Sequence, residues 1–317
     1  MSTCCGASIT TRRPSVIDPT AKYSVTGDDV VEILPASPLA VVAPPLVRLP
    51  DSTAFKRTVL EGFLDGLLGQ GTAAQLSFMH AGASGLLFDL PAGVAANLVQ
   101  RFQCIILSTP MPDTTVAKFV PLRRATDWLD FQREAHVQRR LCTQGTLKPH
   151  VPRLHFAGWS GEWCVLVMAH VAGVTLAQHL LDEDYVGRRL FTRLERMLYL
   201  CWLTGVVHAD LHYSNILLRR LPRGVGGLWP VLLDFGNAVC LPDDMVRRLE
   251  RTFRWYNTAS DVYFDQLSLY VRKVMGARGV AKFNPDGLTL RLLENRLSDD
   301  CSRRDLRRKR YHTWAND

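Results

Sequence analysis

Two short segments join apolar runs to side chains that could do chemistry. The first, 207–218, reads Val-His-Ala-Asp-Leu-His-Tyr-Ser-Asn-Ile-Leu-Leu and contains His208, Asp210 and Asn215. The second, 231–236, reads Val-Leu-Leu-Asp-Phe-Gly and contains Asp234. In each, a strand-like run meets polar residues capable of catalysis or metal binding, and carboxylate and carboxamide oxygens are the ligands that a hard cation prefers. These two segments are therefore the candidate site of the chain.

The order His-x-Asp, an Asn five residues after the Asp, and then Asp-Phe-Gly resembles the protein-kinase-like phosphotransferase superfamily. The resemblance implies an α+β, two-lobed fold with a small strand-rich N-lobe and a reduced helical C-lobe, and ATP and Mg²⁺ as cofactors. It also implies that Asp210 accepts or orients the proton of the acceptor hydroxyl, while Asn215 and Asp234 hold the metal. His208 would brace the catalytic loop rather than act as an acid or base.

Two charged residues upstream occur in the order that the same resemblance requires. Val116-Ala-Lys118 is similar to the strand whose lysine contacts the α- and β-phosphates of ATP, and Glu134 is similar to the helical glutamate that pairs with that lysine. Taken singly, such a lysine is usually a solvated strand residue and such a glutamate ordinary helix surface. The interpretation depends on all of these residues occurring together and in order.

A glycine turn precedes the lysine. Gly82 and Gly85 resemble the second and third glycines of the kinase phosphate loop, with His80 in place of the first. A pair of glycines alone most often marks a simple turn. By resemblance, Leu87 would cover the adenine ring.

Residues 166–173 resemble the hinge between the lobes. In that comparison Met168 would guard the back of the nucleotide pocket, while Ala169 and Val171 would offer backbone groups to adenine. Without the resemblance, a methionine in such an apolar run is more often core filler.

Hydrophobic spacing predicts the elements that position these residues. Helices are expected over 53–67, 127–141, 176–181, 191–203, 264–275 and 288–297, and strands over 76–79, 86–90, 101–108, 114–120, 153–157 and 163–168, with 30–34 as a further strand. Residues 91–115 are expected to be an insert. The predicted organisation is a loosely docked leader over 1–50, a kinase-like domain over 51–300 divided into lobes at 51–168 and 172–300, and a basic tail over 301–317.

Composition excludes several classes of protein. With 47% hydrophobic and 21% charged residues the chain is neither disordered nor fibrous. Eight cysteines without a CxxC pair favour free thiols in a reducing compartment, and no run is long enough to span a membrane. We expect an intracellular protein of the cytoplasm or nucleus that does not contact membranes. Half of the formal charge of +8 lies in residues 302–317, so nucleic-acid contact is expected, if anywhere, only in the tail.

Some features depart from ordinary protein kinases. His212 occupies the place of a lysine, which resembles aminoglycoside and choline kinases, while His-Ala-Asp-Leu resembles the RIO group of atypical kinases. The segment after Gly236 is short and lacks Ala-Pro-Glu, as in compact kinases of large DNA viruses. Within it, Asp261 is expected to buttress the catalytic loop, with Asp265 as its rival.

The sequence thus predicts an ATP-dependent kinase, with Ser/Thr hydroxyls of a protein substrate as the first choice of acceptor. A small-molecule kinase of the aminoglycoside or choline type is the first alternative, because of His212 and the missing Ala-Pro-Glu. A pseudokinase that acts as a scaffold is the second. His80 in the glycine turn favours the scaffold, whereas the full set of polar site residues opposes it.

Overall fold

The computed structural model describes residues 53–280, apart from 83–84, 109–111, 113, 184, 221–226 and 256–259. It also describes Val30–Val31 and the separate residues Asn284, Asp286, Thr289, Leu292 and Arg296; the side chains of 251–266 are not described. The basic tail, the rest of the leader, and most of the helix expected at 288–297 therefore lie outside the described residues.

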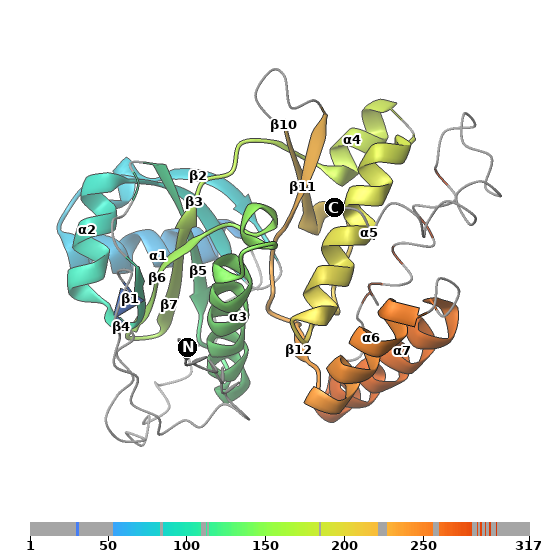
Figure 1. Cartoon of the computed structure of the whole chain (residues 1–317). Coiled ribbons are helices and arrows are strands. Elements are labelled where there is room, and N and C mark those ends of the chain that lie inside the picture. Colours follow the sequence, from blue (N-terminus) through green and yellow to red (C-terminus); the bar gives the residue numbers. More distant parts are fainter. Residues whose placement is uncertain are drawn as a thin grey trace, which may run out of the picture.

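Two lobes lie side by side, as Figure 1 shows. The N-lobe is built on a seven-stranded antiparallel sheet in the order β1-β4-β6-β7-β5-β3-β2. Its strands are β1 (Val30–Val31), β2 (Ser77–Ala81), β3 (Leu86–Pro91), β4 (Gln103–Ser108), β5 (Thr114–Pro121), β6 (Leu154–Ser160) and β7 (Trp163–Ala169). The two-lobed α+β fold expected from the sequence is confirmed.

Helices cover both faces of this sheet. Helices α1 (Thr53–Leu68) and α2 (Ala92–Arg101) bury Leu60, Leu64 and Leu98 against the face that carries Ala117 and Phe119. Helix α3 (Ala125–Thr143) packs on the opposite face, which looks toward the second lobe (Figure 1). Because side chains alternate along a strand, Lys118 lies on the α3 side of β5.

The 91–115 region is part of the sheet rather than an appended loop. It contains α2, which the sequence pattern above does not predict, and β4, which pairs with β1 on one side and with β6 on the other. The insert thus widens the N-lobe sheet and adds a helix to its outer face. The strands predicted around it agree with β2, β3, β4 and β5 to within a few residues.

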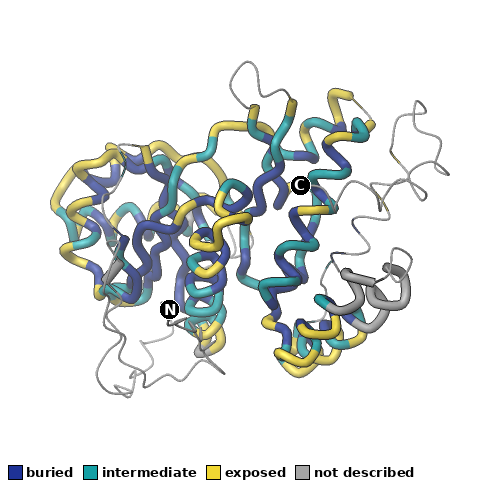
Figure 2. Tube along the Cα trace, in the orientation of Figure 1, coloured by how far each residue is buried: buried dark blue, intermediate teal, exposed yellow. Residues whose placement is uncertain are grey.

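The C-lobe begins after the hinge at 170–173. It contains β8 (Val174–Thr175), α4 (Leu176–Glu183), α5 (Arg188–Leu203), β9 (Val206–Val207), β10 (Ile216–Arg220), β11 (Leu228–Leu232), β12 (Val239–Cys240), α6 (Asp243–Trp255) and α7 (Ser260–Ala277). The buried central strands and α5 form the dark core of Figure 2. One cluster of buried side chains runs from α3 to α5, so the lobes share a hydrophobic core. Within the described part of the chain, no helix is long and apolar enough to cross a membrane.

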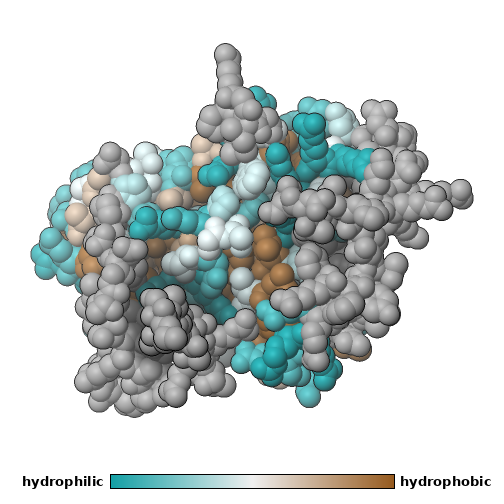
Figure 3. Space-filling view, viewed as in Figure 1, coloured by the Kyte–Doolittle hydropathy of each residue, from teal (hydrophilic) through white to brown (hydrophobic). Residues whose placement is uncertain are grey.

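Helix α6 occupies the segment that follows Gly236, where the sequence pattern above predicts no element. Val246 and Leu249 are buried, and the Tyr199 hydroxyl of α5 donates to the Leu249 carbonyl at 3.5 Å. The opposite side is charged, with Asp243, Asp244, Arg247 and Arg248 exposed, and this surface is hydrophilic in Figure 3. The segment after Gly236 is therefore largely a docked helix.

Gly173 fixes the distance between the hinge and the catalytic region. A Cβ at this position would lie 2.5 Å from the carbonyl oxygen of Leu218. Directly after Gly173, β8 pairs with β10, so Val174 lies opposite Leu218. Only glycine allows the hinge backbone to approach β10 this closely.

We expect Gly173→Ala to lower the free energy of unfolding by about 1–3 kcal/mol, the usual cost of inserting an atom into a packed site. Urea denaturation, monitored by circular dichroism, measures the free energy of unfolding of wild type and variant. Gly93→Ala in α2 is the matched control, since its Cβ would meet no atom within 4 Å and alanine favours helices. Equal stability of the two variants would contradict the steric argument.

Candidate active site

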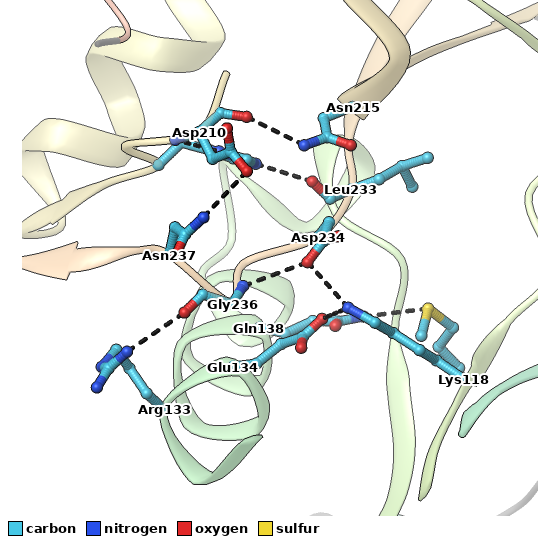
Figure 4. Close-up of polar contacts among 12 residues, drawn as sticks. Lys118, Arg133, Glu134, Gln138, Asp210, Asn215, Leu233, Asp234, Gly236 and Asn237 are labelled. Carbon is cyan, nitrogen blue, oxygen red and sulfur yellow. Dashed lines mark hydrogen bonds and ion pairs between the residues drawn. The ribbon is translucent and has the colours of Figure 1, made fainter. Parts of the chain in front are cut away.

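A buried lysine joins two carboxylates at the junction of the lobes. Lys118 Nζ of β5 lies 2.6 Å from Glu134 Oε1 of α3 and 2.9 Å from Asp234 Oδ1, which follows β11 (Figure 4). Lys118 and Glu134 are 8% and 4% exposed, whereas the Asp234 side chain is 39% exposed and faces the cleft. The three elements thus meet at one cation, and the carboxylate of Asp234 remains accessible.

The three groups change each other's pKa. Burial alone would lower the pKa of Lys118, but the charges of Glu134 and Asp234 outweigh it, so the pKa is raised. Burial works to raise the pKa of Asp234, yet the charge of Lys118 prevails and the pKa falls to about 2. Burial raises the pKa of Glu134 to about 7, against the opposing charge of Lys118. Two carboxylates share one cation here, and the more deeply buried one binds a proton first.

His208 holds the catalytic loop to the neighbouring strand. Its Nε2 donates to the Leu233 carbonyl at 2.8 Å, and its Nδ1 accepts from the backbone N–H of Asp210 at 3.3 Å. The ring is 1% exposed and packs against Phe235 with 5.2 Å between ring centroids. With both nitrogens engaged by the backbone, His208 is placed as a structural link between the loop and the Asp-Phe-Gly segment.

Asp286 fixes the backbone of the catalytic loop. Its carboxylate, 2% exposed, accepts the backbone N–H groups of His208 at 3.0 Å and Ala209 at 2.9 Å, and Trp202 Nε1 at 2.9 Å. Ala209 has a φ of 62°, a strained value for a residue other than glycine, and the bond to Asp286 helps to hold it. The sequence analysis expects Asp261 to buttress this loop, and in the structure Asp286 accepts both amides. The side chains of Asp261 and Asp265 lie outside the described ones.

Asp210 lies beside Asn215 (Figure 4). One oxygen of its carboxylate accepts from Asn237 Nδ2 at 3.0 Å, and the other accepts from Asn284 Nδ2 at 3.4 Å. Asn215 Nδ2 donates to the Asp210 carbonyl at 3.0 Å. This bond orients the amide of Asn215 and assigns its Oδ1 as the oxygen available to a cation.

A magnesium ion suits the oxygens of Asn215 and Asp234. Both are hard oxygen ligands, and the low pKa of Asp234 keeps its carboxylate ionised at neutral pH. Asp234 has a φ of 60°, and the N–H of Gly236 donates to its Oδ1 at 3.4 Å. Among the described residues no group of three or more His, Cys, Asp or Glu could hold a metal. Nucleotide phosphates would therefore have to supply the remaining ligands, as is usual for Mg²⁺.

The residues expected at the nucleotide line one face of the sheet. Leu87 of β3 and Leu166 of β7 lie directly opposite Lys118 of β5 on either side. Val116, which the sequence analysis did not select, shares this face two residues before Lys118 and lies opposite Met168. Leu87, Val116 and Met168 thus form one apolar strip beside the lysine.

The glycine turn and the hinge border this strip. Gly82 donates its N–H to the Gly85 carbonyl at 2.9 Å, which closes the turn. A Cβ at Gly85 would lie 2.5 Å from the Phe119 carbonyl, so glycine is needed there for close packing on β5. At the hinge, the N–H of Ala169 donates to the Arg153 carbonyl at 2.8 Å, which fixes the backbone at the end of β7. Val171 follows in the half-buried connection to β8.

Three polar residues of the site escaped the sequence-based selection: Asn237, Asn284 and Asp286. Asn237 follows Asp-Phe-Gly directly, and that position could have marked it. Asn284 and Asp286 lie more than seventy residues after the loop that they contact. No short-range pattern connects them to it.

The comparison with known families agrees with this geometry. Residues 97–260, just over half of the 317-residue chain, match the ABC1 atypical kinase-like domain. The chain belongs to the ABC1 atypical kinase-like family. No curated protein matches the chain in a sequence search.

The ABC1 match places the chain among the atypical members of the protein-kinase-like superfamily, which confirms the resemblance seen in the sequence. It supports a kinase-like phosphotransferase that uses ATP. The matched ABC1 region includes the polar residues of the cleft: Lys118, Glu134, Asp210, Asn215 and Asp234. It begins after the glycine turn at 82–85 and ends before Asn284 and Asp286.

The raised pKa of Glu134 predicts an unusual pH dependence in this ABC1 chain. Between its ordinary value of 4.5 and about 7, the folded protein binds more protons than the unfolded chain. The free energy of unfolding should therefore fall as pH rises through this window, by a larger amount in wild type than in Glu134→Gln. Urea denaturation at pH 5, 6, 7 and 8 measures both proteins. Parallel pH profiles would contradict the raised pKa.

Proposed function

We propose that this protein is an ATP- and Mg²⁺-dependent phosphotransferase that transfers the γ-phosphate of ATP to a hydroxyl group. The observation that carries the proposal is Lys118 held between Glu134 and Asp234. This contact requires α3 and the Asp-Phe-Gly segment to be in place together. Phosphoryl transfer depends on positioning and charge neutralisation, and this arrangement offers both before any ligand binds.

Each polar residue of the cleft has a part in the proposed reaction. Lys118, oriented by Glu134, binds the α- and β-phosphates, and Asn215 and Asp234 hold the metal. Bound Mg²⁺ neutralises charge on the phosphate oxygens. Asp210 accepts a hydrogen bond from the acceptor hydroxyl and aligns its oxygen with the γ-phosphorus. The apolar strip of Leu87, Val116 and Met168, together with backbone groups of Ala169 and Val171, receives the adenine, and the glycine turn at 82–85 covers the phosphates.

A Ser/Thr hydroxyl of a protein is the acceptor predicted from the sequence motifs. One structural observation favours the alternative, a small-molecule hydroxyl. Helix α6 starts at Asp243, close behind Gly236, and packs on α5 through Val246 and Leu249. The docked helix leaves little extended backbone after Gly236 to align a peptide, whereas a compact alcohol needs only the space beside Asp210.

A scaffold without activity is the third candidate, and the site geometry argues against it. A binding module has no chemical need for Asp210 and Asn215 beside the Lys118 cluster. Buried charges are costly unless they are paired, and here a 39% exposed carboxylate faces the cleft. The paired buried charges and the exposed carboxylate of Asp234 are what a site that binds phosphate groups and a metal requires.

We expect Asp210→Asn to lower kcat by at least about 100-fold, the usual range for a group that handles the transferred proton. The affinity for a fluorescent ATP analogue should stay within about twofold, because Asp210 contacts the acceptor rather than the nucleotide. Asp234→Asn is the comparison, since it should weaken Mg²⁺-dependent nucleotide binding as well as turnover. Unchanged turnover in Asp210→Asn would refute its assigned role.

Transfer of radiolabelled γ-phosphate from Mg·ATP decides the acceptor class. Purified wild type is offered generic protein acceptors and, in parallel, a panel of alcohols and aminoglycosides, with Asp210→Asn and Asp234→Asn as controls. From helix α6 we expect label on small molecules. Label on protein that disappears in both variants would instead establish the protein-kinase branch. Absence of transfer together with absence of ATP turnover would favour the scaffold.

A further inference from the structure

The carboxylate of Asp210 lies between two carboxamide groups that come from different parts of the chain. Asn237 follows the Asp-Phe-Gly segment and donates to Oδ2 at 3.0 Å, as Figure 4 shows. Asn284 lies beyond α7 and donates to Oδ1 at 3.4 Å. Asp210 itself is half-buried. Both oxygens of the proposed catalytic carboxylate therefore have a neutral hydrogen-bond donor.

The backbone around Asn284 is fixed to the catalytic loop. Asn284 and Asp210 form a parallel β-bridge, and the N–H of Leu211 donates to the Asn284 carbonyl at 3.2 Å. Further along the chain, the Thr289 hydroxyl donates to the Leu211 carbonyl. Asp286, between them, accepts the amides described above. The contact of Asn284 with Asp210 is thus one of several contacts that Asn284, Asp286 and Thr289 make with the loop.

Asn237 is anchored on both sides as well. The carbonyl of Gly236 accepts from Arg133 at 3.3 Å, and the carbonyl of Ala238 accepts from Arg278 at 3.1 Å. Arg133 lies on α3, and Arg278 follows α7. The side chain of Asn237 is therefore presented to Asp210 by a backbone that two cations hold in place.

Neutral amides suit this task. An ionised carboxylate has about four acceptor sites, and two donors leave at least one on each oxygen for an incoming hydroxyl. An amide fixes the orientation of the carboxylate and leaves its negative charge in place. A lysine or arginine at the same position would neutralise that charge. The amide also has no ionisable proton of its own, so it leaves Asp210 free to receive the proton of the acceptor.

We propose that Asn237 and Asn284 are positioning residues that clamp the Asp210 carboxylate between their amides and aim it at the acceptor hydroxyl. The inference rests on the proposed phosphotransferase function. It assigns part of the active site to residue 284, outside the region that matches the family. The clamp acts through Asp210 and does not contact the nucleotide.

The test measures ADP release from Mg·ATP with water as acceptor, for Asn237→Ala, Asn284→Ala and wild type. We expect kcat to fall about tenfold for Asn237→Ala and about threefold for Asn284→Ala, whose hydrogen bond is longer. KM for ATP and the affinity for a fluorescent ATP analogue should stay within about twofold. Asn97→Ala is the matched control, because Asn97 is exposed on α2. Asn237→Ser retains a donor and should recover part of kcat.

A double-mutant cycle separates positioning from a merely structural role. In an Asp210→Ala background, neither asparagine substitution should lower the residual rate further, because the carboxylate that they position is gone. Three results would overturn the clamp: equal fold-losses of kcat in the wild-type and Asp210→Ala backgrounds, a rise in KM for ATP that parallels the fall in kcat, or asparagine variants that behave like Asn97→Ala. In each of these cases, turnover by wild type would still support the proposed function. Wild type without ATP turnover would overturn both.

Discussion

The site depends on one cation shared by two carboxylates across three separate elements. Lys118 comes from the N-lobe sheet, Glu134 from the helix between the lobes, and Asp234 from the C-lobe. A buried charge is tolerated only where partners compensate for the loss of water, so displacement of any one element leaves the others with an unpaired charge. The ionic contact and the hydrophobic core that runs from α3 to α5 therefore support the same arrangement of the lobes.

This arrangement also places the carboxylate with the lower pKa at the more exposed position. Burial raises the pKa of Glu134 to about 7, whereas the charge of Lys118 lowers the pKa of Asp234 to about 2, so Asp234 stays ionised at neutral pH. Asp234 is the more exposed carboxylate of the pair, and it is the one that the cleft presents to a ligand. Burial of Glu134 and exposure of Asp234 thus give two chemically similar carboxyl groups different tasks: Glu134 orients Lys118, and Asp234 is available to a ligand.

Much of the fold and site could be predicted from local patterns, and the misses share a physical cause. The glycine turn, the lysine strand, the glutamate helix and the two catalytic segments are each short and locally encoded, and most expected elements agree with the structure. Helix α2 was missed because Gly93 and its small neighbours weaken the helical pattern within a stretch interpreted as an insert. Helix α6 carries Met245, Val246 and Leu249 at helical spacing, and it was missed because the segment after Gly236 was interpreted only by its shortness and its lack of Ala-Pro-Glu.

The contacts of the catalytic loop were harder to predict. Asp261 is expected as a buttress from its position in the sequence, and its side chain lies outside the described ones, whereas Asp286 accepts the loop amides. Asp286 and Asn284 reach them from a segment that carries no motif. Only the three-dimensional path of the chain brings residues this far apart together, and no pattern of spacing in the sequence specifies that path.

The contacts of Asn284, Asp286 and Thr289 with the catalytic loop have a consequence for how the protein is made. A ribosome completes the family-matched region before it synthesises Asp286, which accepts the loop amides at 208 and 209. Until then, the strained backbone at Ala209 lacks the acceptor that holds it, and the loop has only its contacts with residues 215–237 to support its final shape. The lobes can thus assemble early around their shared core, while the catalytic loop reaches its final conformation only when the last part of the domain has emerged and folded back onto it.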